Sequence, residues 1–192
     1  KKIGSGTETM FRKHPKLIHG LSANAPTKAF LAGYISHLTL DETWITQVYQ
    51  PYLGDINSFS TPVQATIADR VIQLDIDRIA RTYLNDKGNL LKCLENSEYN
   101  VKIEFLPSKL LTEWRTWVGT YIQQPFSWER LHFLVRRSHN QDETAKTQVE
   151  LFLKTLDVNL SRVYARLPSN CIGLFSQESI AQATRLIRHY LY

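Results

Sequence analysis

Apolar side chains recur along most of this chain every three or four residues, the period of an α-helix that buries one face. The pattern is clearest late in the chain, where Val149, Phe152, Leu156, Leu160 and Val163 follow it. Six segments show this period, and none of them alternates as the strands of a sheet would. We therefore predict an all-α protein built by helix-on-helix packing. The predicted helices span residues 27–49, 61–84, 107–124, 128–137, 140–167 and 176–191.

Helix start signals precede most of these segments. Thr61 and Pro62 are typical of an N-cap followed by the first helical position, where the missing N–H of proline costs nothing. Asn140, with Glu143 three residues later, forms a capping-box pattern. Residues 101–105 alternate like a short strand, but no second strand is available to pair with them.

The composition is that of one globular domain. The chain has 192 residues, of which 43% are hydrophobic and 21% are charged. Its apolar stretches are shorter than the ~18 residues that a membrane helix needs, so we expect no transmembrane segment. No apolar segment follows the basic start as it would in a signal peptide, which favours a cytoplasmic location. Because the chain lacks an initiator Met, we expect the N-terminal part of this single all-helical domain, residues 1–192, to be missing.

The formal charge of +5 is concentrated at the N-terminus. Residues 1–16 hold five basic side chains and one acidic one, whereas the rest of the chain holds 18 basic and 17 acidic side chains. A nearly neutral body does not offer the basic face that nucleic acids require, so no nucleic-acid partner is expected. Residues 1–26 also contain three glycines and two prolines, and we predict a loose basic segment there.

His37 and Asp41 are the pair of residues most capable of chemistry. Four residues apart on a helix, they share one face, with about 5 to 6 Å between their Cβ atoms. That spacing allows an imidazole nitrogen and a carboxylate oxygen to bind one metal ion. Segment 27–49 is apolar on nearly all sides, so we predict a helix buried in the middle of a bundle, where a carboxylate needs a cation or another partner. Gly33, one turn earlier, would leave space for a ligand or another helix.

Two simpler explanations of this pair stay open. His37 and Asp41 can hydrogen-bond to each other or to their neighbours, and Asp41 can lie near a solvated helix end. The second helix adds Asp69, Gln73 and Asp77 on one stripe, where intrahelical ion pairs on a solvated face are the favoured interpretation.

The aromatic stretch from Trp114 to Trp128 allows two interpretations. Its Trp and Tyr side chains suit a membrane-interface or ligand surface, because they combine an apolar body with a polar tip. Packing in the core is the favoured interpretation.

The segment Ala29–Trp44, continued by Val48–Gly54, resembles bacterial proteins of the zinc-dependent phospholipase C family, and Asp69–Arg78 resembles a second signature of an uncharacterised branch of that family. The resemblance covers residues 13–81. It implies an all-α multi-helix bundle of the phospholipase C/P1 nuclease type, with zinc in a cleft between helices.

What the resemblance implies for function is a metal-dependent phosphodiester hydrolase. Zinc would be held by His37 and Asp41, with Asp69 as a weaker third ligand, and the substrate would be a phospholipid or another phosphodiester. A metal-activated water would attack that phosphodiester. The alternative is a helical module that has altered or lost this activity and binds a partner or lipid on the same scaffold.

Overall fold

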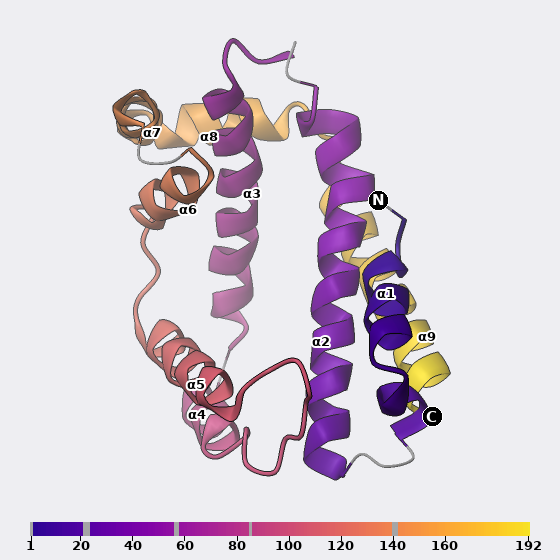
Figure 1. The fold of residues 1–192 in the computed structure, drawn as a ribbon. Helices are drawn as coiled ribbons and strands as arrows, with labels where there is room; N and C mark the ends of the chain where they lie inside the picture. Colours follow the sequence, from indigo (N-terminus) through magenta and orange to yellow (C-terminus); the bar gives the residue numbers. More distant parts are fainter. Residues whose placement is uncertain (1, 21–23, 56–57, 85, 140–141) are drawn as a thin grey trace. The chain divides into compact units, whose positions relative to one another are not determined.

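The computed structural model describes residues 2–20, 24–55, 58–84, 86–139 and 142–192. Within these ranges the chain contains helices and no strand, so the prediction of an all-α protein is confirmed. Figure 1 shows the helices with the labels used below. Their bounds are α1 Ser5–Lys13, η1 Pro15–Gly20, α2 Ala25–Trp44, η2 Ile45–Leu53, α3 Pro62–Thr82, α4 Lys87–Leu94, α5 Ser108–Gln123, α6 Arg130–Ser138, α7 Glu143–Lys154, α8 Leu156–Tyr164 and α9 Cys171–Leu191.

The chain divides into two compact units, and each is described by itself. The first unit comprises Lys1–Thr46, Asp86–Pro125 and Gly173–Tyr192. The second comprises Gln47–Asn85 and Phe126–Ile172.

The core of the first unit forms where α1, α2 and α9 meet (Figure 1). One stripe of α2, with a buried residue every four positions, faces this core. Trp44 at the end of α2 packs edge-on against Phe175 of α9, with 5.2 Å between ring centroids. The core residues are Met10, Phe11, Leu17, Leu31, Ile35, Ile103, Leu186 and Leu191.

Residues 5–13 and 15–20 are helical, and a contact with α2 holds α1 in place, so the prediction of a loose segment over residues 1–26 is wrong for them; residues 1 and 21–23 lie outside the described residues. Helix α1 begins after Gly4, whose φ of 90° suits glycine, and no side chain within α1 caps it. The buried Glu42 carboxylate supplies the cap. It accepts hydrogen bonds from Gly4 N at 2.6 Å, from Gly6 N at 2.7 Å and from Ser5 Oγ at 2.7 Å. The orphan N–H groups and the dipole of α1 thus meet a negative charge from another helix.

The second unit is arranged around α3, against which α6, α7 and α8 pack (Figure 1). The predicted N-cap is confirmed, because the Thr61 hydroxyl accepts a hydrogen bond from Gln64 N at 3.2 Å. A buried carboxylate joins α3 to α8. Tyr164 donates its hydroxyl hydrogen to Asp75 Oδ2 at 2.8 Å, and Arg78 contacts Asp75 Oδ1 at 2.8 Å. Burial and this hydrogen bond to an ionised carboxylate both raise the pKa of Tyr164 above its usual value.

The segment predicted as one helix over 140–167 is two helices, α7 and α8, which separate at Thr155. The side chain of Asn159 stabilises this interruption between the two helices. Its Nδ2 donates to Phe152 O at 2.9 Å and to Thr155 Oγ1 at 3.0 Å. Asn140 of the predicted capping box lies outside the described residues, and Asp142 caps α7 by accepting from Thr144 N at 2.9 Å.

Residues 101–105, which alternate like a short strand, do not form one. They follow α4 as irregular backbone, and Lys102 N donates to Thr27 Oγ1 at 2.9 Å in place of a strand partner. Across the described residues, no helix has the length and apolar character needed to cross a membrane.

Candidate functional site

His37 and Asp41 lie on one face of α2, as predicted. The distance between His37 Nε2 and Asp41 Oδ2 is 3.6 Å. The two side chains are 53% and 57% exposed, so the prediction that they lie on a buried helix is wrong. The physical reason is that α2 buries only one stripe, which includes Leu31 and Ile35, while the predicted ligands lie on another side.

An apolar pocket of about 350 Å³ lies beside this pair in the first unit. Helix α2 contributes Gly33, Tyr34 and His37 to its lining, and α4 and α5 contribute apolar side chains that include Leu94 and Trp114. A Cβ at Gly33 would meet no heavy atom within 4 Å, which confirms that this glycine faces open space. The volume and the mainly apolar lining are typical of a site for a small ligand.

One ion pair supplies polar groups to this lining. Arg115 Nε lies 2.8 Å from the carboxylate of Glu98. The pKa of the Glu98 carboxyl is lowered, chiefly because the carboxylate accepts a hydrogen bond from the backbone amide of Glu98 and also because the Arg115 guanidinium lies beside it. Desolvation of the carboxyl acts in the opposite direction and raises the pKa. Glu98 is therefore ionised at neutral pH and already paired, so the two charges form a fixed, neutral part of the lining.

Trp114 and Trp117 of α5 face solvent, so the prediction that the aromatic stretch packs in the core is wrong for these two residues; Tyr121 and Trp128 are half-buried. Trp114 is 63% exposed and Trp117 is 57% exposed. Trp117 stacks on Tyr121, with 5.4 Å between ring centroids. Because Trp114 also lines the apolar pocket, an exposed aromatic stripe continues from the pocket along α5.

Asp69, the third predicted ligand, lies on α3 in the second unit, so the three predicted ligands are divided between the two units. Its carboxylate is buried and engaged within its own helix. Gln73 Nε2 donates to Asp69 Oδ1 at 2.9 Å, and Arg70 Nε lies 3.5 Å from Oδ2. The predicted intrahelical pairing is therefore confirmed for Asp69, on a face that is buried instead of solvated.

The geometry of the α2 pair fits two positions around one metal ion. At ~2.0 to 2.1 Å from zinc and at the tetrahedral angle, two ligand atoms lie about 3.4 Å apart. The 3.6 Å between His37 Nε2 and Asp41 Oδ2 is close to this value. A catalytic zinc takes three protein ligands. Among the described residues, no group of three or more His, Cys, Asp or Glu side chains could hold a metal ion.

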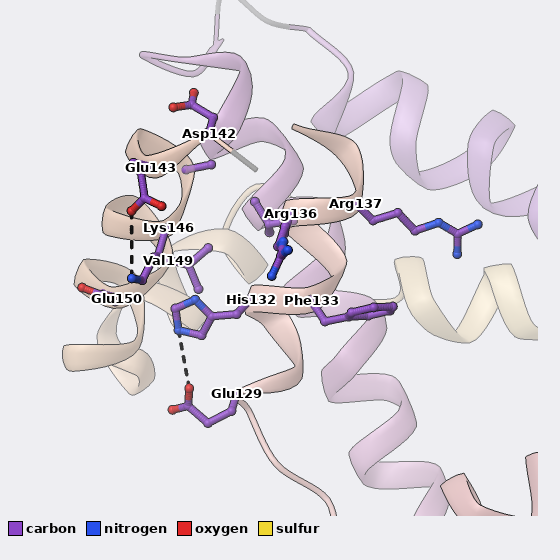
Figure 2. A pocket seen from close by; sticks show the side chains of 12 residues that line it. Glu129, His132, Phe133, Arg136, Arg137, Asp142, Glu143, Lys146, Val149 and Glu150 are labelled. Carbon is purple, nitrogen blue, oxygen red and sulfur yellow. Dashed lines mark ion pairs between the residues drawn. The ribbon is translucent and has the colours of Figure 1, made fainter. Parts of the chain in front are cut away.

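A larger pocket, of about 990 Å³, lies between α6 and α7 in the second unit. Figure 2 shows that some of the charged side chains in its lining form ion pairs with each other. Glu129 pairs with His132 at 3.5 Å, and Glu143 pairs with Lys146 at 3.9 Å. Phe133 and Arg137 point away from these pairs (Figure 2). With four carboxylates and four basic side chains in its lining, this pocket favours neither anions nor cations.

Comparison with known protein families, curated proteins and solved structures finds no significant match for this chain. The pocket residues that sequence reasoning missed are those of α4 and α5. The helical spacing of Leu111, Trp114, Arg115 and Val118 could have placed them on adjoining faces of α5, but not next to His37.

Proposed function

We propose that the first unit holds the active site of a metal-dependent hydrolase of the phospholipase C type, which acts on a phosphodiester with an apolar chain. One observation carries the proposal: His37 belongs both to the predicted ligand pair and to the lining of the apolar pocket. An amphiphilic substrate needs polar and apolar surfaces side by side, and this pocket offers them.

In this proposal one group of residues would bind the metal and another would bind the substrate. His37 and Asp41 would supply two of the ligands of the metal, and their exposure leaves the space around them open to water and to a phosphate group. The pocket lined by Phe30, Trp114 and Val118 would take the apolar part of the substrate. A bound zinc ion lowers the pKa of water and neutralises charge on phosphoryl oxygens.

The test is zinc content together with hydrolysis. We expect the purified chain to bind zinc, and to release a phosphorylated head group from phosphatidylcholine vesicles. His37→Ala should remove both properties. His132→Ala is the matched control, since His132 forms a similar pair with Glu129 at 3.5 Å in the second unit. Equal zinc content and turnover in the two variants would contradict the proposal.

A second function, lipid binding without catalysis, is favoured by the state of Asp69. Its carboxylate oxygens are engaged by Gln73 and Arg70, so releasing it to a metal would break those contacts. On this view the His37–Asp41 contact is an exposed i,i+4 pair on the surface of α2, and such pairs contribute little to stability. The pocket would still hold an apolar chain.

Filling the pocket tests both functions. Leu at position 33 would project into the space beside α2 without meeting other atoms near its Cβ. Gly33→Leu should therefore keep the fold, with a gain of up to about 1 kcal/mol from helix propensity, and lose lipid binding. Gly173→Leu is the control, because a Cβ at Gly173 also meets nothing within 4 Å and Gly173 lies in another helix, α9. Lipid binding that survives Gly33→Leu would exclude this pocket from either function.

A variant that separates the two functions is His37→Ala. A hydrolase should lose turnover in this variant, whereas a binding module should bind lipid as the unmodified chain does. The readouts are head-group release and binding to phosphatidylcholine vesicles, measured on the same preparations.

A further inference from the structure

The second unit carries another pocket, between α3, α7 and α8, with a volume of about 470 Å³. Its floor is apolar, since Ile67, Ala68 and Val163 are all buried. Its charged lining consists of Arg162 and Arg166, and no carboxylate is among the described residues that line it. The pocket is therefore cationic, unlike the charge-balanced pocket between α6 and α7.

The hydrogen bonds around this pocket fix the direction of two amide side chains. Gln148 Oε1 accepts the Thr61 hydroxyl hydrogen at 3.0 Å, and Gln64 Oε1 accepts from Ser60 N at 3.3 Å. Because both oxygens are acceptors in these bonds, each Nε2 group remains available as a donor. Neither Nε2 group has a partner among the described residues, and both glutamines line the pocket.

The two arginines differ in how firmly they are held. The Arg166 guanidinium lies 4.1 Å from the centroid of the Phe59 ring, and its Nη2 donates to Ser58 O at 3.0 Å. Arg162, one turn earlier, has no partner among the described residues. One cation is thus positioned in advance by an aromatic ring, and the other is available to a ligand.

Charge and hydrogen bonding point to the same kind of ligand. A guanidinium and two amide N–H groups without partners are donors that an anion satisfies, and charge-assisted hydrogen bonds are the stronger ones. The pocket also presents Phe59 and Phe152, which suit an apolar body. In the α6–α7 pocket, by contrast, four carboxylates lie among the basic side chains of the lining, and two of these carboxylates form ion pairs (Figure 2).

We propose that this pocket binds a small organic anion, a phosphate or carboxylate group joined to an apolar body. Arg162 and the Nε2 groups of Gln64 and Gln148 hold the anionic group. The two phenylalanines contact the body. The proposal is independent of the hydrolase, because the site proposed for hydrolysis lies in the first unit.

Four probes test the ligand class by isothermal titration calorimetry with the full chain: phenyl phosphate, inorganic phosphate, benzoate and its neutral analogue benzamide. Phenyl phosphate, benzoate or both should bind. Benzoate should bind more tightly than benzamide, and phenyl phosphate more tightly than inorganic phosphate; the stronger of the two anions identifies the anionic group. Binding of benzoate and benzamide with equal, measurable affinity, or the absence of binding by both phenyl phosphate and benzoate at millimolar concentration, would overturn the proposal.

Variants then locate the site. Arg162→Gln should weaken binding of the stronger probe at least about tenfold, the loss expected for one hydrogen bond to a charged group. Gln148→Glu, which places a negative charge in the lining, should weaken it further. Arg137→Gln is the control, since Arg137 lines the other pocket and points away from the ion pairs in Figure 2. Circular dichroism establishes that each variant is folded, and equal affinities in Arg162→Gln and Arg137→Gln would refute the assignment.

Discussion

Glu42 offers the sharpest test of how the first unit is held together. Its side chain is buried, and its two carboxylate oxygens accept three hydrogen bonds at 2.6 to 2.7 Å from the first residues of α1. A net hydrogen bond to a charged group is worth about 1.5–3 kcal/mol. In Glu42→Gln one oxygen becomes an amide nitrogen that faces an N–H donor, so one or two of these bonds are lost.

We therefore expect Glu42→Gln to lower the free energy of unfolding by about 2–4 kcal/mol, and Glu42→Ala to lower it by about 3–5 kcal/mol. The measurement is urea denaturation followed by circular dichroism. Hydrogen exchange of the α1 amides should also accelerate, because the substitution removes hydrogen bonds that tie the start of α1 to α2 and local opening of α1 then costs less.

Glu113→Gln is the control for loss of a carboxylate, since Glu113 is exposed and only 3.9 Å from Lys109. It should change stability by less than about 0.5 kcal/mol. If Glu42→Gln were as mild as this control, the reasoning that Glu42 caps α1 would be refuted.

Three further predictions concern stability. Tyr164→Phe should cost about 1–3 kcal/mol, measured by urea denaturation, because Asp75 loses a hydroxyl donor while it stays buried. The pKa of Glu98 is lowered in the folded state, so its carboxylate stabilises the fold above the unfolded value of about 4.3, and this contribution is lost as the pH falls through the folded pKa. The urea midpoint of Glu98→Gln should consequently fall less than that of the unmodified chain on acidification, and an equal fall would contradict the pairing. Ile72→Ala, at a fully buried position, should cost about 2–5 kcal/mol, whereas Ile79→Ala, 42% exposed, should cost less than about 1 kcal/mol; similar thermal shifts in the two variants would contradict the assigned burial.

Local signals in the sequence predicted α2, α3, α5, α6 and α9, but not α1 or α4. The start of α3 at Thr61 and Pro62 could be predicted because an N-cap is a contact between neighbours in the chain. The break between α7 and α8 could not, since it depends on the side chain of Asn159 reaching back to Phe152. The cap of α1 was even harder to predict from the sequence, because Glu42 lies 36 to 38 residues from its partners.

The features of the candidate site could likewise be predicted only where they depend on neighbours in the sequence. The spacing of His37 and Asp41 predicted their shared face, since this follows from helix geometry alone. Their exposure could not be predicted, because α2 is apolar on several sides and only tertiary packing decides which side is buried. Nor could the sequence bring Trp114 beside Gly33, since the two residues come from distant segments of the first unit.

The division of the chain into two units has a consequence for its synthesis. The first unit draws on three separate segments, and its core requires Leu186 and Leu191 as well as Met10 and Phe11. The second unit is built from residues 47–85 and 126–172. A chain that emerges from the ribosome N-terminus first can therefore complete the second unit before the first, although the first begins the sequence. Until then Met10 and Phe11 lack their partners from α9, so α1 leaves apolar side chains uncovered during translation.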